Sequence, residues 1–175
     1  FGQGSFRVTG NTYDLALSGD GFFAVEYTNS AGETDTKYTR SGSFTLDVEG
    51  YLVTKDGHYV LGTNSQPIQL DTLADAHIDE LGNITQNDKI IAQIQVVDFE
   101  DYDYLMKYGD TFYQPKEGAK MIEGNAKINS GYLEMSNVQV VSEMVNLIAI
   151  TRAYESNQKI IQTYDGTLEI AANQL

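Results

Sequence analysis

The sequence predicts a mainly β protein with an irregular β-sandwich or barrel-like core, followed by a long C-terminal α-helix. Over residues 5–85, short apolar or alternating runs are separated by turn pairs such as Asp-Gly. Short runs with such turns are typical of strands joined by hairpins in a sandwich or barrel. Beyond Ser136 the apolar residues instead recur at intervals of seven. We therefore expect a β-rich core over residues 1–130 and a coiled-coil-type helix over residues 131–175.

Within the β region, the segment Lys89–Val97 gives the clearest strand signal. It is rich in β-branched residues and alternates in polarity, and it is apolar enough to predict burial on most of one face. Phe22 and Phe23 alternate across another strand, so we expect one in the core and the other beneath a loop or helix. The preceding Gly19–Gly21 segment is expected to be a tight turn, since it opens a strand and lacks the pattern of a phosphate-binding loop.

The C-terminal helix is expected to begin near Ser136, which forms a capping-box pattern with Gln139, and to run to about Gln174. At about 1.5 Å per residue it is roughly 60 Å long, whereas a globule of about 130 residues is roughly 35 Å across. The body cannot cover the whole apolar edge, so another helix must cover the rest. The residues at intervals of seven, which we predict to form the subunit interface, are Leu133, Val140, Leu147, Tyr154, Ile161, Leu168 and Leu175.

The composition excludes several classes of partner. The net charge is −14, with only 11 basic residues, which disfavours nucleic acid and anionic membrane surfaces as partners. No apolar run approaches the roughly 20 residues that span a bilayer, so direct membrane insertion is not expected. The absence of cysteine removes disulfides and thiol chemistry.

No catalytic, cofactor-binding or metal-binding residues are predicted, and we do not expect an enzyme. The acidic stretch Asp98–Asp103 lacks the glycine-bearing turn of a calcium loop and is expected to be a solvated loop. His58 and His77 lie without neighbouring zinc ligands, and no GxSxG nucleophile elbow is present. Paired carboxylates of a glycosidase remain open, because their spacing is spatial.

Arg40 has two possible roles. Its guanidinium can tie turn carbonyls or a carboxylate such as Asp47 within the chain, or it can form a charge pair with a neighbouring subunit.

Three blocks of the sequence resemble the bacterial flagellar axial proteins, specifically the basal-body rod proteins. The first block contains Thr9-Gly10-Asn11, Asp14-Leu15-Ala16 and Gly19–Val25. The second contains Tyr38–Phe44, Leu46-Asp47, Gly50–Val53 and Leu61-Gly62. The third contains Gly131–Val138, Glu143–Ile148, Arg152–Glu155, Asn157 and Lys159. The large additional domain of the hook subunit has no room between Gly62 and Gly131, which leaves the rod proteins.

The resemblance implies a β-rich core flanked by N- and C-terminal helices that pair in a tubular homopolymer of the flagellar basal body. It further implies passage through the flagellar export apparatus and contact with neighbouring rod and hook proteins. The block Arg152–Glu155 looks most like the distal-rod protein, with the proximal-rod protein next. Only a few residues precede Thr9, so we expect a further N-terminal helical segment in the intact protein.

Two functions are therefore weighed. The first is a structural subunit of the flagellar rod, which polymerises into the drive shaft through helix packing. The second is a secreted all-β binding module, an adhesin or a carbohydrate-binding domain, on a helical stalk.

Overall fold

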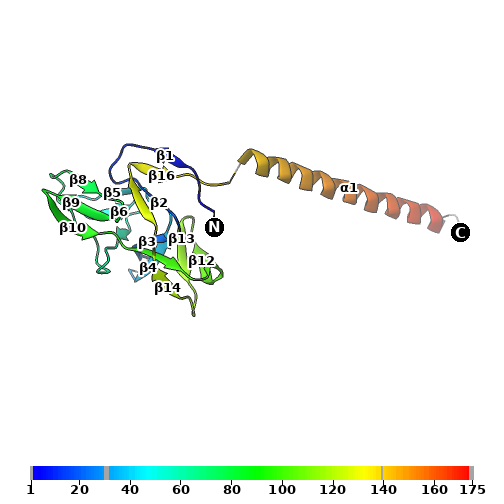
Figure 1. Ribbon diagram of the computed structural model, residues 1–175. Coiled ribbons are helices and arrows are strands. Elements are labelled where there is room, and N and C mark those ends of the chain that lie inside the picture. Colours follow the sequence, from blue (N-terminus) through cyan, green and yellow to red (C-terminus); the bar gives the residue numbers. More distant parts are fainter. Residues whose placement is uncertain (1, 30–31, 139, 174–175) are drawn as a thin grey trace. The chain divides into compact units, whose positions relative to one another are not determined.

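The computed structural model describes residues 2–29, 32–138 and 140–173, and within the C-terminal helix it describes the side chains of residues 142–164. The chain divides into two compact units, Phe1–Ser136 and Asn137–Leu175. The first unit consists of short β-strands and the second contains one long α-helix (Figure 1). The predicted class, mainly β with a long C-terminal helix, is confirmed.

Within the residues that the structure describes, the β unit contains sixteen short strands and one turn of 3-10 helix. The first eight strands are β1 (Phe6–Val8), β2 (Leu15–Ser18), β3 (Phe22–Thr28), β4 (Thr34–Thr39), β5 (Phe44–Leu46), β6 (Leu52–Thr54), β7 (Tyr59–Val60) and β8 (Ala76–Ile78). They are followed by β9 (Asn83–Gln86), β10 (Lys89–Gln93), β11 (Val96–Phe99), η1 (Tyr102–Tyr104), β12 (Leu105–Tyr108), β13 (Phe112–Pro115), β14 (Met121–Glu123), β15 (Lys127–Ser130) and β16 (Tyr132–Glu134). The helix is α1 (Val140–Asn173).

The strands form one large sheet and three small ones, all with antiparallel pairing. The nine-stranded sheet runs in the order β12-β13-β4-β3-β7-β6-β5, and β11 joins β3 to β14 at its side. The strands β10-β9-β8 form a second sheet, and the pairs β15-β2 and β1-β16 form two ribbons. None of these sheets closes into a barrel, so the irregular, open form of the predicted core is the one observed.

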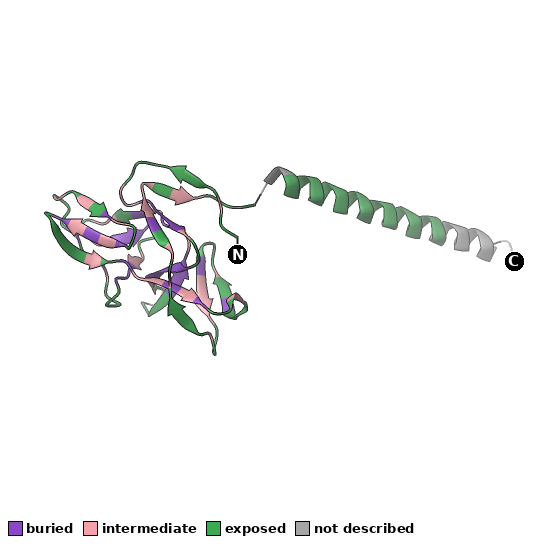
Figure 2. Cartoon of the chain, viewed as in Figure 1, coloured by how far each residue is buried: buried purple, intermediate pink, exposed green. Residues whose placement is uncertain are grey.

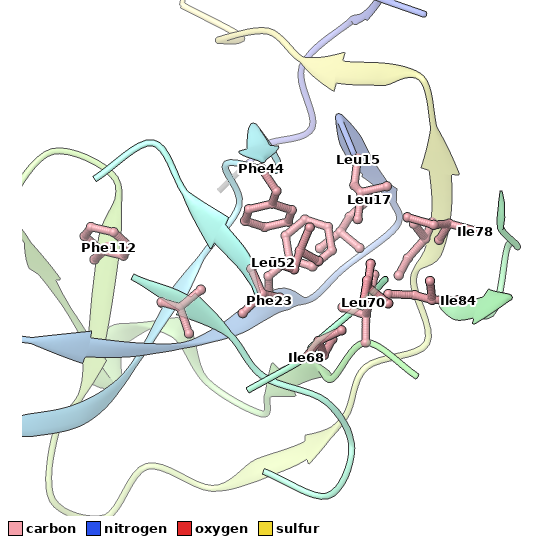
Figure 3. Close-up of a cluster of buried hydrophobic side chains, with 14 residues drawn as sticks. Leu15, Leu17, Phe23, Phe44, Leu52, Ile68, Leu70, Ile78, Ile84 and Phe112 are labelled. Atoms are coloured by element: carbon pink, nitrogen blue, oxygen red, sulfur yellow. The ribbon is translucent and has the colours of Figure 1, made fainter. Parts of the chain in front are cut away.

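Strand β3 separates two hydrophobic clusters. Phe23 and Val25 point into the larger cluster, which also contains Leu15, Leu17, Phe44 and Leu52 (Figure 3). Phe22 and Ala24 point into a smaller cluster on the other face. Because both faces of β3 are covered, its first four residues are all buried.

The prediction for the two phenylalanines is confirmed. Phe23 is fully buried in the larger cluster and meets Phe44 edge-on, with ring centroids 5.2 Å apart. Phe22 lies beneath the η1 segment, with its ring centroid 5.8 Å from that of Tyr102 and 6.0 Å from that of Phe99. Both aromatic side chains are therefore used inside the molecule.

The segment Lys89–Val97 is not the single buried strand that its pattern predicts. It is split into β10 and β11, and between them Ile94 forms a bridge with Gly62. Strand β10 lies at the edge of its sheet, and Ile90 is 68% exposed. A register shift between Ile90 and Ala92 breaks the alternation there. The pattern correctly predicts that Ile94 and Val97 are buried. Periodicity cannot, however, predict that the segment changes its partner strand.

Among the turns whose five residues are all described, three hairpin turns share one geometry, at Asp47–Tyr51, Thr54–His58 and Asp79–Asn83. In each turn the first residue's N–H donates to the fifth residue's carbonyl, and its side-chain oxygen accepts from the fifth residue's N–H. The fourth residue is a glycine with a φ of +81° to +85°, the left-handed conformation that glycine adopts without steric cost. In the Asp79 turn, the Asn83 side chain and the Asn83 N–H both donate hydrogen bonds to the Asp79 carboxylate. These bonds, the side-chain bond first, lower the pKa of the Asp79 carboxyl.

A fourth turn, Gly62–Gln66, has the same backbone bonds but places Ser65 at the left-handed position, with a φ of +56°. Ser65 is exposed. A residue with a Cβ is strained in this conformation by roughly 1–2 kcal/mol.

We expect Ser65→Gly to raise the free energy of unfolding by about 0.5–1 kcal/mol, because relief of strain exceeds the entropy that glycine adds to the unfolded chain. Gly57 supplies the reverse control, since its φ is +85° and nothing lies within 4 Å of an added Cβ. Gly57→Ser should therefore lower the stability by about 1 kcal/mol through backbone strain alone. Urea unfolding followed by tyrosine fluorescence measures both. A destabilised Ser65→Gly variant would contradict the strain argument.

A group of aromatic side chains packs against the larger cluster. The His58 ring lies over Tyr27, with centroids 4.3 Å apart, and 5.5 Å from Phe112. Lys37 is 3% exposed, and its Nζ donates to Asp35 at 2.6 Å and lies 4.7 Å from the centroid of the Tyr108 ring. Burial lowers the pKa of His58, and the nearby Asp56 only partly opposes this effect.

Because the unfolded chain binds the His58 proton more readily than the folded chain, stability should fall as pH drops below the ordinary histidine pKa of about 6.5. Stability is retained above this value. Urea unfolding at pH 7.5 and pH 5.5 should show a smaller loss for His58→Phe than for the wild type. The exposed His77 provides the control, and His77→Asn should keep the wild-type pH dependence. An equal loss in the wild type and in His58→Phe would show that His58 does not cause it.

Candidate assembly interface

Helix α1 extends from Val140 to Asn173 and contains 34 residues, which corresponds to a length of about 50 Å. It contains no proline and only Gly166 as a glycine, so nothing in its sequence breaks it. Glu143 in the first turn is favourably placed for the helix dipole. The helix begins four residues later than predicted, and Gln139, the predicted capping partner of Ser136, lies outside the described residues.

Every side chain of α1 that the structure describes is exposed (Figure 2). Of the predicted interface residues, Leu147 is 67% exposed, Tyr154 is 71% exposed and Ile161 is 61% exposed. Val140 and Leu168 lie in α1, but their side chains are outside the described set, and Leu175 lies outside the described residues altogether. We use the name heptad row for the helical members: Val140, Leu147, Tyr154, Ile161 and Leu168.

Leu133 is not part of a helical face. It lies in β16, opposite Arg7 of β1, and it is half-buried. The interval of seven between Leu133 and Val140 therefore has no helical meaning, because β16 and a connecting segment lie between them. The heptad row begins at Val140, and an interface role for Leu133 stays a prediction.

The exposed apolar surface of α1 is wider than the heptad row. The other large apolar side chains that are more than half exposed are Met144, Val145, Ile148, Ile150, Ile160 and Tyr164. Each such side chain forgoes roughly 1.5–3 kcal/mol of burial. An exposed apolar surface of this extent is typical of interaction sites.

The N-terminal and C-terminal ends of the β unit lie side by side. Strand β1 pairs with β16, and the Met135 N–H donates to the Ser5 carbonyl at 2.8 Å (Figure 1). The Gly4 N–H donates to the Glu134 carboxylate at 2.9 Å. The segment before Phe6 therefore lies beside the segment that follows β16.

Arg40 connects β16 to the turn that precedes β3. Its Nε and Nη2 donate to Glu134 Oε2 at 3.2 and 3.1 Å, and its Nη1 donates to the carbonyls of Gly19 and Gly21 at 2.9 and 3.0 Å. The structure thus supports the first of the two roles considered, an arginine that ties turn carbonyls and a carboxylate within the chain. The carboxylate is that of Glu134, whereas Asp47 accepts from the backbone of its own turn. Gly19 and Asp20 form a bend between β2 and β3, and Gly19 and Gly21 both have positive φ values.

The acidic stretch Asp98–Asp103 is only in part the expected solvated loop, because Asp98 lies in β11 and Tyr102 and Asp103 lie in η1, which leaves the exposed Glu100 and Asp101 between them. Asp98 accepts from the Tyr102 hydroxyl at 2.8 Å, and burial together with this carboxylate raises the pKa of Tyr102. Asp101 caps η1, and Glu100 pairs with Lys120 at 3.1 Å. Over residues 2–29, 32–138 and 140–173, no group of three or more His, Asp or Glu side chains is arranged to hold a metal. Within the same ranges, no helix combines the length and apolarity needed to cross a membrane.

Comparison with known proteins decides the family. Residues 129–175 match the family model of the flagellar basal body rod FlgEFG protein C-terminal region, and residues 16–86 match that of the flagellar hook protein FlgE/F/G D1 domain. The chain is 36% identical to the flagellar basal-body rod protein FlgG of Bacillus subtilis, over 95% of this chain and 67% of that protein. It belongs to the flagellar basal-body rod proteins.

Other relatives agree. The rod protein FlgF of Caulobacter vibrioides is 38% identical over 98% of the chain and 67% of its own length. FlgG of Borreliella burgdorferi is 34% identical over 99% of the chain and 68% of its own length. The chain thus spans about two thirds of these relatives.

The family confirms the first of the two functions weighed, a structural rod subunit of the flagellar basal body, and nothing supports a binding module on a stalk. The relatives are structural proteins, which agrees with the expectation of a protein that is not an enzyme. FlgG and FlgF match at similar identity, so the preference for the distal over the proximal rod stays a prediction. The exposed face of α1 lies within the matched C-terminal region.

Removal of the Arg40 fork should weaken the attachment of β16. The Glu134 side chain is only 12% exposed, so Arg40→Met leaves a largely buried carboxylate with one partner fewer and should cost about 1–3 kcal/mol of stability. Arg40→Lys keeps the charge but cannot reach two carbonyls and a carboxylate together, so it should recover only part of the loss. Urea unfolding gives the stability. Hydrogen exchange of β16 should show the loss first, and unchanged exchange there would contradict the role.

Proposed function

We propose that α1 is the assembly element of this rod subunit. Its exposed apolar face packs against helices of neighbouring subunits in an inner layer, while the β unit forms the outer wall and sets subunit spacing. The observation that carries the proposal is the exposure of Leu147, Tyr154 and Ile161 at intervals of seven along one helix. A seven-residue apolar repeat keeps one edge of a helix against a partner over many turns.

The β unit needs no such partner to satisfy its interior. No buried side-chain nitrogen or oxygen in the described ranges lacks a hydrogen-bond partner, and two hydrophobic clusters fill it. The two units therefore have different roles. The β unit buries its own core, whereas α1 leaves its apolar face for a partner. Head-to-tail contacts that do not close on themselves then produce a helical filament.

An N-terminal helix is the partner that the family resemblance implies, and the pairing of β1 with β16 favours it. Any segment that precedes Phe6 starts beside the connection to α1. Contacts with neighbouring rod and hook proteins and passage through the flagellar export apparatus belong to the same proposal.

Leu147→Asp should abolish self-association or co-assembly, because it places a charge in the middle of the apolar face, where burial of an unpaired carboxylate is prohibitive. The β unit should remain folded, since Leu147 lies in the other unit. Sedimentation measures association, and near-ultraviolet circular dichroism of the tyrosines reports on the β unit.

Ala149→Asp is the matched control. It adds the same charge two residues away, about 200° around the helix from Leu147, and should leave association intact. Unchanged assembly of Leu147→Asp would remove the heptad row from the mechanism.

A further inference from the structure

Two edge strands on opposite sides of the β unit carry exposed apolar side chains (Figure 1). Strand β1 pairs with β16 on one side, and its Phe6 and Val8 side chains are exposed. Strand β14 pairs with β11 on one side, and its Met121 and Ile122 side chains are exposed. The open side of an edge strand offers backbone N–H and carbonyl groups to a strand of another chain.

The hydrogen bonds of β1 determine which of its backbone groups face outward. Just beyond its end, the Thr9 N–H donates to the Gly131 carbonyl at 2.8 Å. Because bonding alternates along an antiparallel strand, the N–H and carbonyl of Arg7 face β16. Those of Phe6 and Val8 face away from β16, and the described part of the chain contains no hydrogen bond to them.

The same alternation holds in β14. The Gly124 N–H donates to the Val96 carbonyl at 3.2 Å, so the N–H and carbonyl of Ile122 face β11. Those of Met121 and Glu123 face away from β11, and no described residue forms a hydrogen bond with them. Strands β1 and β14 thus each present two outward residues that are separated by one inward residue.

We propose that β1 of one copy of this chain pairs with β14 of the next copy in an antiparallel edge contact, with Phe6 opposite Glu123 and Val8 opposite Met121. In this register all the outward residues form hydrogen-bonded pairs, and each pair exchanges both of its N–H···O bonds. A shift by two residues keeps only one of these pairs. The inference rests on the proposed function, and it specifies how the β units of the outer wall contact one another.

Charge favours this edge contact over contacts between identical strands. If β1 paired with β1 of another copy, Phe6 opposite Val8, Arg7 would lie directly opposite Arg7. If β14 paired with β14 in the same way, the Glu123 carboxylates of the two copies would lie diagonally on one face. Like charges that face each other across strands are destabilising, and diagonal neighbours are within reach of long side chains. Pairing of β1 with β14 avoids both repulsions.

Arg7 also attracts the partner strand. It is exposed, and it is the only charged residue among residues 2–10. In the edge contact it lies opposite Ile122, which in turn lies opposite Asp98 of β11. The aliphatic stem of Arg7 then covers Ile122, while its guanidinium faces the carboxylates of the acidic stretch Asp98–Asp103.

The edge contact joins two different edges, so it does not close on itself. Because β1 and β14 lie on opposite sides of the β unit (Figure 1), each copy keeps one open edge for the next copy. The contact therefore repeats from copy to copy, as the head-to-tail assembly of a filament requires.

The chain contains no cysteine, so introduced thiols report the edge contact without interference. Val8→Cys and Met121→Cys in full chains should form a mixed disulfide in a glutathione redox buffer, because a hydrogen-bonded pair places the two Cα atoms about 5.5 Å apart, within disulfide range. A chain with both substitutions should form a ladder of linked multimers on a non-reducing gel, because the contact does not close.

Val8→Cys mixed with Ile122→Cys is the matched control. It should form far less disulfide, since neighbouring residues of a strand point to opposite faces. Equal yields from the two mixtures would overturn the edge contact, as would a doubly substituted chain that stops at dimers.

Glu123→Pro tests the backbone pairing. The Glu123 N–H faces away from β11, so proline there preserves the bonds between β14 and β11 but removes a donor from the open edge. The yield of the mixed disulfide should fall about tenfold, whereas Glu123→Ala, which keeps the N–H, should retain most of it. Near-ultraviolet circular dichroism checks that the β unit remains folded. Equal yields from the proline and alanine variants would show that no strand pairing occurs.

The edge contact and the proposed function fail differently. Association that Leu147→Asp abolishes, without excess mixed disulfide in chains that keep Leu147, would overturn the edge contact and leave the assembly role of α1 in place. A ladder that persists with Leu147→Asp would support the edge contact and overturn the assembly role of α1.

Discussion

The exposed apolar face of α1 is the constraint on which the rest of the molecule depends. A helix of 34 residues with Leu147, Tyr154 and Ile161 all more than 60% exposed derives little stability from its own hydrogen bonds, because most helical stability in proteins comes from tertiary packing of an apolar face. In the proposed assembly, folding of the chain and formation of the polymer are therefore linked: the helix acquires its full stability from contact with helices of neighbouring subunits. This linkage explains why the β unit must be complete by itself.

Strand β3 and the hairpin turns allow the β unit to bury its own core. Burial of both faces of β3 lets two small clusters share one strand, and five-residue hairpin turns close neighbouring strands without long loops. Gly50 shows how tightly these turns are packed, since an added Cβ would lie 2.2 Å from the Leu70 carbonyl oxygen. The same constraint applies at Gly42, where the Leu15 carbonyl oxygen lies 1.7 Å from the position of a Cβ.

Local chemistry was readable from the sequence, whereas long-range pairing was not. The hairpin turns, the alternation of Phe22 and Phe23, and the long helix all follow from residue types within a few positions of one another. By contrast, Glu134 as the partner of Arg40 lies 94 residues away, and no local pattern indicates it. The division of Lys89–Val97 between two sheets and the place of Leu133 in β16 were missed for the same reason: apolar periodicity reports that a side chain is buried, but not against which strand.

In the proposed assembly, a force on α1 reaches the β unit through the connection between the two units. Only the chain after Glu134 links them covalently, so a load on α1 acts first on β16. That strand is held by β1 on one edge, by the Gly131 and Tyr132 N–H groups, which donate to the Asp14 carbonyl at 2.8 and 3.3 Å, and by the Arg40 fork. Arg40 also binds the turn that opens β3. The arginine therefore joins the last strand before the helix to the strand at the centre of both clusters.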